Sequence, residues 1–384
     1  MSAPVDVYFD PASNGHRRNR LFDLASTPYA GDQIVAPYVV AKKRLEALGY
    51  RVQTADMLPE RPNGRINLVI SFGTPDRLIA FSVWRYRRLA RRPDVVLSAF
   101  LAMECPVVEP TMFAALPALS RMFRRILSWS DTAALQRFTG SPVAVEHFSW
   151  PQSFDAVHQE LWARGDRKFL LMMNTNKLPR LYVNELYTAR LKAVEFFHRF
   201  GEVDLYGRGW NRPPARVGKT WTPGIMRRMG TALWRLRQRI VPDPVYVAAA
   251  GANRGPAKSK SETMSQYRFA LCFENSVLKG WMTEKLFDCF FCGTIPVYWG
   301  APDILDWVPA ECFIDMRQFR DFAELRSFLH GLRPADEQRY RDAGRAYVES
   351  DRFSSFRGEA FADLMEKIVA ADAGALTPGV ASRG

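Results

Sequence analysis

One stretch of the sequence, residues 267–303, combines apolar runs with a polar loop and a charged helix start. Thr283 is a candidate N-cap residue, and Glu284 follows it in the first turn of the expected helix. A helix start presents free backbone N–H groups and the positive end of the helix dipole, which suit a phosphate. Lys285 adds a full positive charge there. The pattern indicates an anion-binding site, unless Glu284 is an ordinary first-turn acid and Lys285 a surface lysine.

A further carboxylate, Glu104, directly follows the most apolar run of the first half, Val95–Met103. Open α/β sheets bind ligands at the carboxyl ends of their strands, so Glu104 should emerge at such a crevice. A carboxylate in that position can take a proton from a reacting group or serve only as a hydrogen-bond acceptor. Glu109 is the local competitor, but it lies beyond Pro106.

The elements that must position these residues alternate between short apolar runs and helical patterns, which predicts parallel, doubly wound sheets. In the first half we expect strands at 5–9, 51–55, 66–71 and 95–103, and an amphipathic helix at 34–48. After about residue 150 the pattern restarts, with strands at 168–173, 203–206, 269–273 and 294–299, and helices at 184–197 and 283–292. Two such halves predict an α/β protein with two Rossmann-like domains facing each other across a cleft.

The stretch 267–303 resembles the donor-binding signature of the family 10 glycosyltransferases, the α-1,3/1,4-fucosyltransferases, and in particular their bacterial members. That signature is F-E-N, then Y-x-T-E-K, a helix and G-x-x-P-x-x-x-G. The chain has Phe273-Glu274-Asn275, Trp281-Met282-Thr283-Glu284-Lys285, Gly293-Thr294-Ile295-Pro296 and Gly300. Weaker matches extend the resemblance from roughly residue 65 to 365.

The resemblance implies a GT-B fold, with an acceptor-binding domain at 1–155, a donor-binding domain at 156–370 and a frayed tail at 371–384. It implies inverting transfer of fucose from GDP-fucose to a hydroxyl of a surface-glycan acceptor, an oligosaccharide or glycolipid, in α-1,3 or α-1,4 linkage. No carboxylate-metal motif is recognised, so we expect metal-independent chemistry with no cofactor besides the donor substrate.

The resemblance also assigns roles to single residues. Glu104, in Ala102-Met103-Glu104-Cys105-Pro106, matches the family's base in an E-S/P-P-type motif, with Cys105 as a departure. Arg190, in the helix after Asn174-Thr175-Asn176, matches the phosphate-binding arginine, with Arg180 as the runner-up. The other expected donor-site residues are Glu274, Asn275, Trp281, Thr283, Glu284 (sugar hydroxyls), Lys285 (the second phosphate cation), Tyr206 and Gly207 (pocket wall).

Four positions leave alternatives open. Trp281 stands where the family usually has Tyr, so the chain has an indole in place of a hydroxyl, which leaves room for a donor sugar other than fucose. His16 lies in an N-terminal loop that could face the acceptor, although a lone His is more often structural. Cys289 and Cys292 form a single CxxC, a zinc or redox motif or simply two buried small residues one helical turn apart.

The charge of the chain points to an anionic partner, because its 53 basic and 40 acidic residues give +13. Hydrophobic residues make up 47% of the chain and charged residues 24%, and this composition excludes a disordered chain. The segment 208–242 contains nine basic and no acidic residues. Within it, 223–240 reads as a basic amphipathic helix with Trp234 near the edge of its apolar stripe. Such a helix suits an anionic membrane surface, or it packs on its own domain with its arginines in water.

We expect no nucleic-acid partner, since no zinc-finger, helix-turn-helix or RNA-binding signature is present. The N-terminal residues lack a basic region followed by an apolar run, so we expect a cytoplasmic protein and leave open its attachment to the inner membrane face. Two other functions remain. One is a family 10 enzyme that uses another nucleotide sugar, and the other is an inactive basic protein that binds membranes or polyanions.

Overall fold

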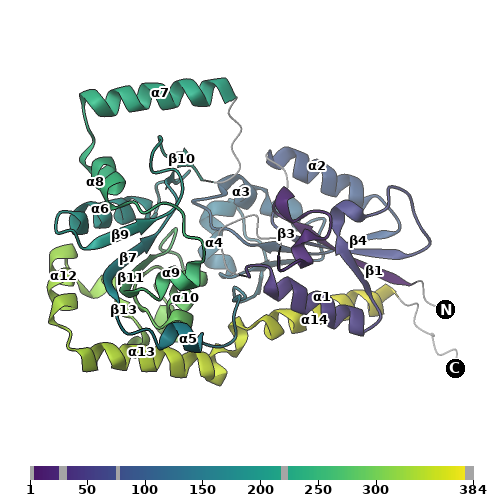
Figure 1. Cartoon of the computed structure of the whole chain (residues 1–384). Helices are drawn as coiled ribbons and strands as arrows, with labels where there is room; N and C mark the ends of the chain where they lie inside the picture. Colours follow the sequence, from purple (N-terminus) through teal and green to yellow (C-terminus); the bar gives the residue numbers. More distant parts are fainter. Residues whose placement is uncertain (1–3, 26–32, 75–77, 218–223, 377–384) are drawn as a thin grey trace.

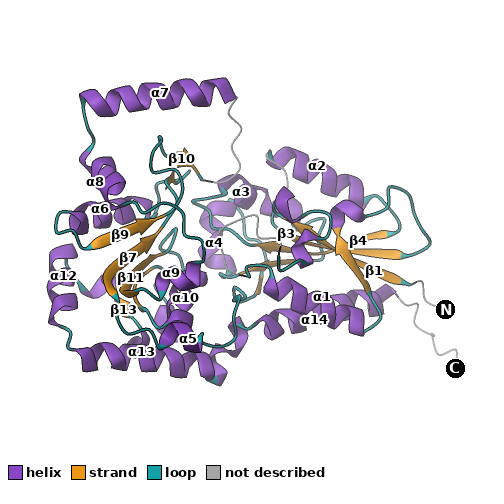
Figure 2. Ribbon diagram, in the orientation of Figure 1, coloured by secondary structure: helices purple, strands orange, loops and turns teal. Residues whose placement is uncertain are grey.

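The computed structural model describes residues 4–25, 33–74, 78–217 and 224–376 of the 384-residue chain. It contains a six-stranded and a five-stranded parallel sheet, each covered by helices (Figures 1 and 2). The predicted α/β class and the two alternating halves are therefore confirmed. Across the described ranges, no helix combines the length and apolar character needed to cross a membrane.

The first sheet is built from apolar runs that are buried along almost their whole length, as strands covered on both faces must be. Its order is β2-β1-β3-β4-β5-β6. The strands are β1 (Val5–Pro11), β2 (Arg51–Thr54), β3 (Ile66–Phe72), β4 (Val95–Ala102), β5 (Arg125–Ser128) and β6 (Glu146–His147). The helices of this half are α1 (Ala36–Ala47), α2 (Ile79–Ala90), α3 (Pro110–Leu119) and α4 (Thr132–Thr139).

The second sheet has the order β13-β12-β11-β7-β9. Its strands are β7 (Lys168–Met173), β9 (Val203–Tyr206), β11 (Tyr267–Phe273), β12 (Ile295–Trp299) and β13 (Ile314–Asp315), while β8 (Lys177–Leu178) and β10 (Ala215–Arg216) form a separate pair. The helices are α5 (Gln159–Trp162), α6 (Tyr187–His198), α7 (Gly224–Ile240), α8 (Pro244–Ala252), α9 (Lys260–Met264), α10 (Glu284–Cys292), α11 (Ile304–Trp307), α12 (Phe322–Gly331), α13 (Pro334–Glu349) and α14 (Gly358–Leu376). Short 3-10 turns occupy 14–16, 20–22, 55–57, 310–312, 316–318 and 351–356.

Both sheets share one topological feature. In each, the first strand in chain order lies between the second and the third, so the chain reverses direction across the sheet between β1 and β3 and between β7 and β11. Ligands of open α/β sheets bind at the carboxyl ends of the strands at such a switch point. The topology therefore predicts ligand binding at the loops after β1 and β3 in the first sheet, and at the loops after β7 and β11 in the second.

The polar loop after β11 holds the start of α6 in place, which is why this helix begins later than the predicted residue 184. Asn184 has a left-handed backbone with a φ of 53°. Its carbonyl accepts hydrogen bonds from the backbone N–H of Val277 at 2.7 Å and from the Ser276 hydroxyl at 3.0 Å. These bonds fix α6 against the loop that contains Asn275.

The C-terminal helix α14 returns to the first sheet. Phe361 belongs to the core of the first half, and Asp372 is buried between Arg124 and Arg125, each with a guanidinium nitrogen 2.9 Å from its carboxylate. Most of α14 falls inside the range 156–370 that the sequence predicted for the second domain, but the helix packs mainly on α1 and β4 of the first half. The tail predicted to fray from 371 is helical through residue 376, and 377–384 lie outside the described residues.

Candidate active site

A cavity of about 660 Å³ lies between the two halves, at the ends of β4, β7 and β9 and at the start of α10. Seven of the ten predicted site residues line it, namely Glu104, Arg190, Tyr206, Gly207, Asn275, Glu284 and Lys285. The other three, Glu274, Trp281 and Thr283, line neither this cavity nor the two smaller ones beside it. Residues separated by up to 181 positions in the chain, from Glu104 to Lys285, thus meet at one place.

The wall of this cavity is strongly basic. Seven cationic side chains line it, against the three carboxylates of Glu104, Glu109 and Glu284. The cations are Lys177, Arg190, Arg208, Arg212, Lys258, Lys260 and Lys285. A concave surface with this excess of positive charge attracts anionic ligands, and its arginines can bind phosphate oxygens in pairs.

Arg190 has its charged group buried among neutral partners. The side chain extends from α6 and is only 4% exposed. Its guanidinium donates to the Phe273 carbonyl at 2.6 and 3.0 Å, to the Asn275 amide oxygen at 2.9 Å and to the Asn174 amide oxygen at 3.3 Å. Among the described residues no carboxylate forms an ion pair with it. Because a buried charge without a counter-charge is unfavourable, an anion bound in the cavity would stabilise Arg190.

Glu274 and Thr283 lie behind the cavity wall and hold Lys285 in position. The fully buried Glu274 carboxylate accepts bonds from the backbone N–H of Thr283 at 2.8 Å and from its hydroxyl at 2.8 and 2.9 Å. It also accepts from the Lys285 Nζ at 3.0 Å. Thr283 is the N-cap residue, as predicted, but its side chain binds Glu274 instead of capping the helix.

Lys285 and Glu284 are both charged at neutral pH because they lie beside each other and beside further charges. Burial alone would lower the pKa of Lys285, but the carboxylates of Glu274 and Glu284 outweigh burial and raise it. Burial would likewise raise the pKa of Glu284, but Lys285 and Lys260 hold it well below its usual range. Glu284 is therefore an ionised acceptor suited to hydroxyl donors.

Lys260 is a site residue that the sequence analysis missed. Its Nζ forms an ion pair with Asp288 and lies 3.5 Å from the Glu284 carboxylate, and it lines all three cavities. The sequence around it, with lysines at 258 and 260 among small residues, is a basic loop before a predicted strand. It lies outside the motifs that carry the family resemblance, so no sequence signal marks it as a site residue.

Glu104 is a carboxylate in the cavity whose pKa is raised. It directly follows β4 and is half-buried, and its Oε2 accepts a bond from the Cys105 backbone N–H at 3.3 Å. Burial, helped by the nearby charge of Glu109, raises its pKa to about 7 against the opposing effect of Lys285. A carboxyl group with a pKa near neutrality can accept a proton and later release it, which suits a general base.

Trp281 has a structural position. It is buried between Trp129 and Trp150, with ring centroids 4.5 and 5.7 Å away in edge-to-face arrangements, and belongs to the core of the first half. The adjacent Gly280 approaches that half so closely that a Cβ atom would lie 2.1 Å from the Trp129 carbonyl oxygen. The segment 280–281 thus attaches the second sheet's loop to the first domain, and its indole does not reach the cavity.

Tyr206 and Gly207 form the wall of the cavity after β9, where the sequence predicted them. The backbone here lies against the loop after β7, since the Asn174 N–H donates to the Tyr206 carbonyl at 2.8 Å. A Cβ atom on Gly207 would lie 1.9 Å from the Asn174 carbonyl oxygen. Only glycine allows this approach, which brings together the polar loops that follow the neighbouring strands β7 and β9.

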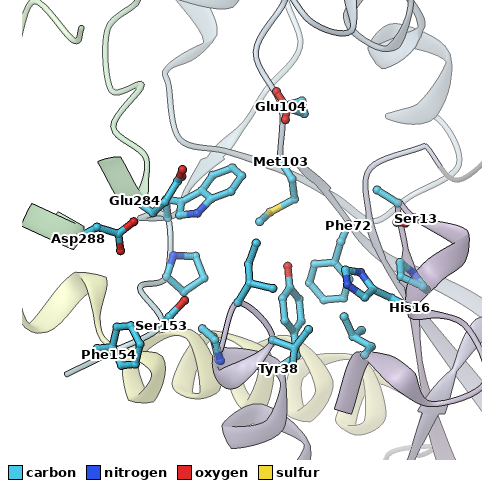
Figure 3. Close-up of a pocket in the computed structure, with 18 of the residues that line it drawn as sticks. Ser13, His16, Tyr38, Phe72, Met103, Glu104, Ser153, Phe154, Glu284 and Asp288 are labelled. Atoms are coloured by element: carbon cyan, nitrogen blue, oxygen red, sulfur yellow. The ribbon is translucent and has the colours of Figure 1, made fainter. Parts of the chain in front are cut away.

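A smaller cavity of about 260 Å³ adjoins Glu104 on the side of the first domain (Figure 3). His16, Tyr38, Phe72 and Met103 face it from the first domain, while Glu284 and Asp288 lie across from them on α10. His16, for which the sequence left an acceptor-facing and a structural role open, lines this cavity. Burial lowers the pKa of His16, so its imidazole is neutral at pH 7.

The remaining candidates lie apart from the large cavity or have structural partners. Arg180 does not line it, and its Nε donates to the Val217 carbonyl at 3.0 Å. Cys289 and Cys292 are buried in α10, and no group of His, Cys, Asp or Glu that could hold a metal ion is found among the described residues. The Cys289 sulfur lies 3.2 Å from that of Cys272.

Part of the chain is similar to one family of known proteins. Residues 226–355 match the model described as glycosyltransferase family 10 (fucosyltransferase) C-term. An α-(1,3)-fucosyltransferase of Helicobacter pylori is 40% identical over 75 residues, 20% of this chain and 16% of that protein. The GDP-fucose protein O-fucosyltransferase 3 of Bos taurus is 39% identical over 87 residues, 22% of this chain and 17% of that protein. The matches thus span less than a fifth of these relatives, and they confirm the resemblance predicted from residues 267–303.

The fold has a counterpart among solved structures. An α-glucosyltransferase in complex with UDP and a 13-mer DNA aligns with a TM-score of 0.53, over 96% of this chain and 100% of that one. At 12% sequence identity the likeness concerns the fold alone. It confirms the predicted GT-B arrangement of two Rossmann-like halves.

Proposed function

We propose that the chain is an inverting fucosyltransferase, because residues 226–355 match the model of the C-terminal part of glycosyltransferase family 10. It takes fucose from GDP-fucose and transfers it to a hydroxyl of a surface-glycan acceptor, in α-1,3 or α-1,4 linkage. One observation carries the proposal: the same cavity contains a carboxylate with a pKa near 7 and a buried guanidinium without a counter-charge.

In the proposed reaction, the Glu104 carboxylate takes the proton of the acceptor hydroxyl as that oxygen attacks the anomeric carbon of fucose. A C–O bond forms on one face of the sugar while the bond to the β-phosphate oxygen breaks on the other, so the configuration inverts. The electron pair leaves with GDP. Arg190 and Lys285 stabilise the diphosphate charge that develops, and Glu284 accepts bonds from sugar hydroxyls.

The smaller cavity is the proposed acceptor site. It opens beside Glu104, and its apolar lining from Tyr38, Phe72 and Met103 suits the apolar faces of sugar rings. The relatives differ in the acceptor their names imply, since one is called a protein O-fucosyltransferase. We favour a glycan acceptor because the cavity is small and lies between the domains, where a single sugar fits better than a folded protein surface.

A donor screen tests the proposed function. We expect GDP-fucose to raise the melting temperature and to be consumed in the presence of oligosaccharide acceptors, and EDTA to leave this turnover in place. GDP-mannose, UDP-galactose and UDP-N-acetylglucosamine serve as matched donors. Turnover of one of these in preference to GDP-fucose would reassign the donor, and failure of all four would support the alternative of an inactive binding protein.

The pH dependence of turnover should report Glu104. A base must be deprotonated, and a carboxyl group with a pKa of about 7 loses its charge as the pH falls through that value. We therefore expect kcat/KM to be constant above neutrality and to fall about tenfold per pH unit below it. An ordinary carboxylate would move the fall to below about pH 5. A flat profile between pH 5 and 8 would contradict the raised pKa.

A further inference from the structure

Helix α7 exposes a continuous apolar stripe to solvent. Figure 1 shows α7 along the upper edge of the molecule, outside the helices that cover the second sheet. Each of the large apolar side chains of the stripe is more than half exposed: Ile225, Met226, Met229, Leu233, Leu236 and Ile240. The predicted helix 223–240 is observed from Gly224 to Ile240, and residue 223 lies outside the described part. Its apolar side is not packed inside the domain.

The opposite side of α7 already has its partner within the chain. Thr231, Trp234 and Gln238 are its half-buried positions. The Trp234 ring contacts that of Tyr246 in α8, with centroids 5.7 Å apart, and the Gln238 amide oxygen accepts from the Asp243 N–H at 2.9 Å. At about 100° per residue, these positions face away from the stripe. Trp234 therefore does not flank the stripe, as the sequence suggested, but attaches the helix to the body.

Arginines flank the stripe on both sides. By helical spacing, Arg228, Arg235 and Arg239 follow one margin and Arg237 follows the other, and all four are exposed. A helix that lies in the surface of a bilayer has this arrangement, because its apolar residues enter the acyl boundary while its arginines reach the headgroups. No acidic residue occurs between 208 and 242 to weaken the attraction to anions.

Helix α2 of the first domain repeats the same combination. Phe81 and Trp84 are each 60% exposed, and Leu78, just before the helix, is 61% exposed. Arg88 and Arg91 continue this line at helical spacing and are exposed, and the Arg88 guanidinium lies 5.8 Å from the Trp84 ring centroid. In Figure 1, α2 lies along the upper side of the first domain, as α7 does over the second.

We infer that α7 and α2 form a bipartite docking face for an anionic lipid bilayer. Two helices from different domains carry exposed apolar side chains together with arginines, and both helices run along the upper side of the molecule in Figure 1. Lipid headgroups of negative charge complement both helices. A second copy of this chain would place one all-basic helix against another, and the like charges would oppose the contact. The inference does not depend on the proposed function, since none of these residues lines the cavities.

Vesicle sedimentation with the full chain tests the docking face. The probes are vesicles of phosphatidylcholine alone and vesicles that also contain phosphatidylglycerol, at low and high salt. We expect binding to the anionic vesicles only, weakened by salt because exposed charges are screened beyond about 10 Å at 0.1 M. Negligible binding to both kinds of vesicle, or binding that ignores lipid charge, would overturn the inference.

Variants separate the contributions of charge and apolar surface. Arg228→Glu, Arg235→Glu and Arg239→Glu combined should lower binding at least tenfold, and so should Met229→Ser, Leu233→Ser and Leu236→Ser combined. Phe81→Ser with Trp84→Ser should lower it severalfold. The matched control reverses three exposed arginines outside both helices, Arg61, Arg121 and Arg320, to Glu. Equal loss in this control would mean that net charge, and not the docking face, drives binding.

Two further measurements complete the test. Because the changed residues are exposed, melting temperatures should stay within a few degrees of the unmodified chain, which shows that the variants fold. Sedimentation equilibrium should show a monomer with or without the serine substitutions. A dimer that dissociates when Met229, Leu233 and Leu236 are replaced would identify a second copy as the occupant of the stripe and would overturn the lipid inference.

Discussion

Replacing Glu104 by Gln is expected to lower turnover by about 10²-fold or more, the usual contribution of a positioned general base. Gln keeps the size of the side chain and an oxygen that can accept from the Cys105 N–H, but it cannot accept a proton at neutral pH. GDP affinity should be unchanged or slightly higher, since the change removes a negative charge from a basic cavity. Steady-state kinetics and calorimetric GDP titration check the two effects separately.

Glu109→Gln is the matched control for this experiment. Glu109 lines the same cavity, and the same charge is removed, but its Oε2 accepts a bond from the Thr74 hydroxyl at 3.3 Å. We expect this variant to retain turnover within a few-fold. If Glu109→Gln is the damaging change and Glu104→Gln is not, the base is Glu109 and the assignment from the motif at 102–106 is wrong.

Replacing Arg190 by Ala should produce the largest loss of GDP binding. Hydrogen bonds to charged groups contribute about 1.5–3 kcal/mol each, so loss of one bond to the diphosphate should weaken binding about 10- to 150-fold. Calorimetry or equilibrium dialysis with GDP measures this loss. The variant also removes the donor that satisfies the buried Phe273 carbonyl, so its melting temperature must be measured alongside.

Two further variants separate binding from folding. Arg190→Lys keeps the positive charge but not the planar fork, and should restore part of the affinity. Arg180→Ala removes an arginine that bonds to the Val217 carbonyl and does not line the cavity, so GDP affinity should remain that of the unmodified chain. If a folded Arg190→Ala protein keeps its GDP affinity and Arg180→Ala loses it, then Arg180, and not Arg190, is the arginine that binds the diphosphate.

The strands could be predicted from sequence because they are buried runs with little ambiguity. The predicted strand 168–173 is the observed β7, and 203–206 is the observed β9. Observed helix boundaries differ from the predicted ones where tertiary contacts decide them. The start of α6 is set by bonds between Asn184 and the loop at 276–277, which no local pattern records. The return of α14 to the first sheet is likewise a long-range contact.

The site was predictable to the extent that its residues follow strand ends or belong to the motif. Glu104, Arg190 and Lys285 meet at the cavity as expected. The motif could not separate residues that touch a ligand from those that support them, because both lie within a few positions of each other. Glu274 and Trp281 therefore belong to the motif but do not line the cavity, whereas Lys260, at the start of α9, lines the cavity but lies outside the motif.

The position of α14 bears on how the chain is made. The hydrophobic core of the first sheet includes Phe361, Met365 and Val369, which leave the ribosome only after the whole second sheet has been synthesised. Until then, the outer face of α1 has no cover, and Arg124 and Arg125 have no Asp372 to bind. The half that is translated first is thus completed last. During synthesis the core of the second sheet can form before the core of the first sheet receives its final helix, α14.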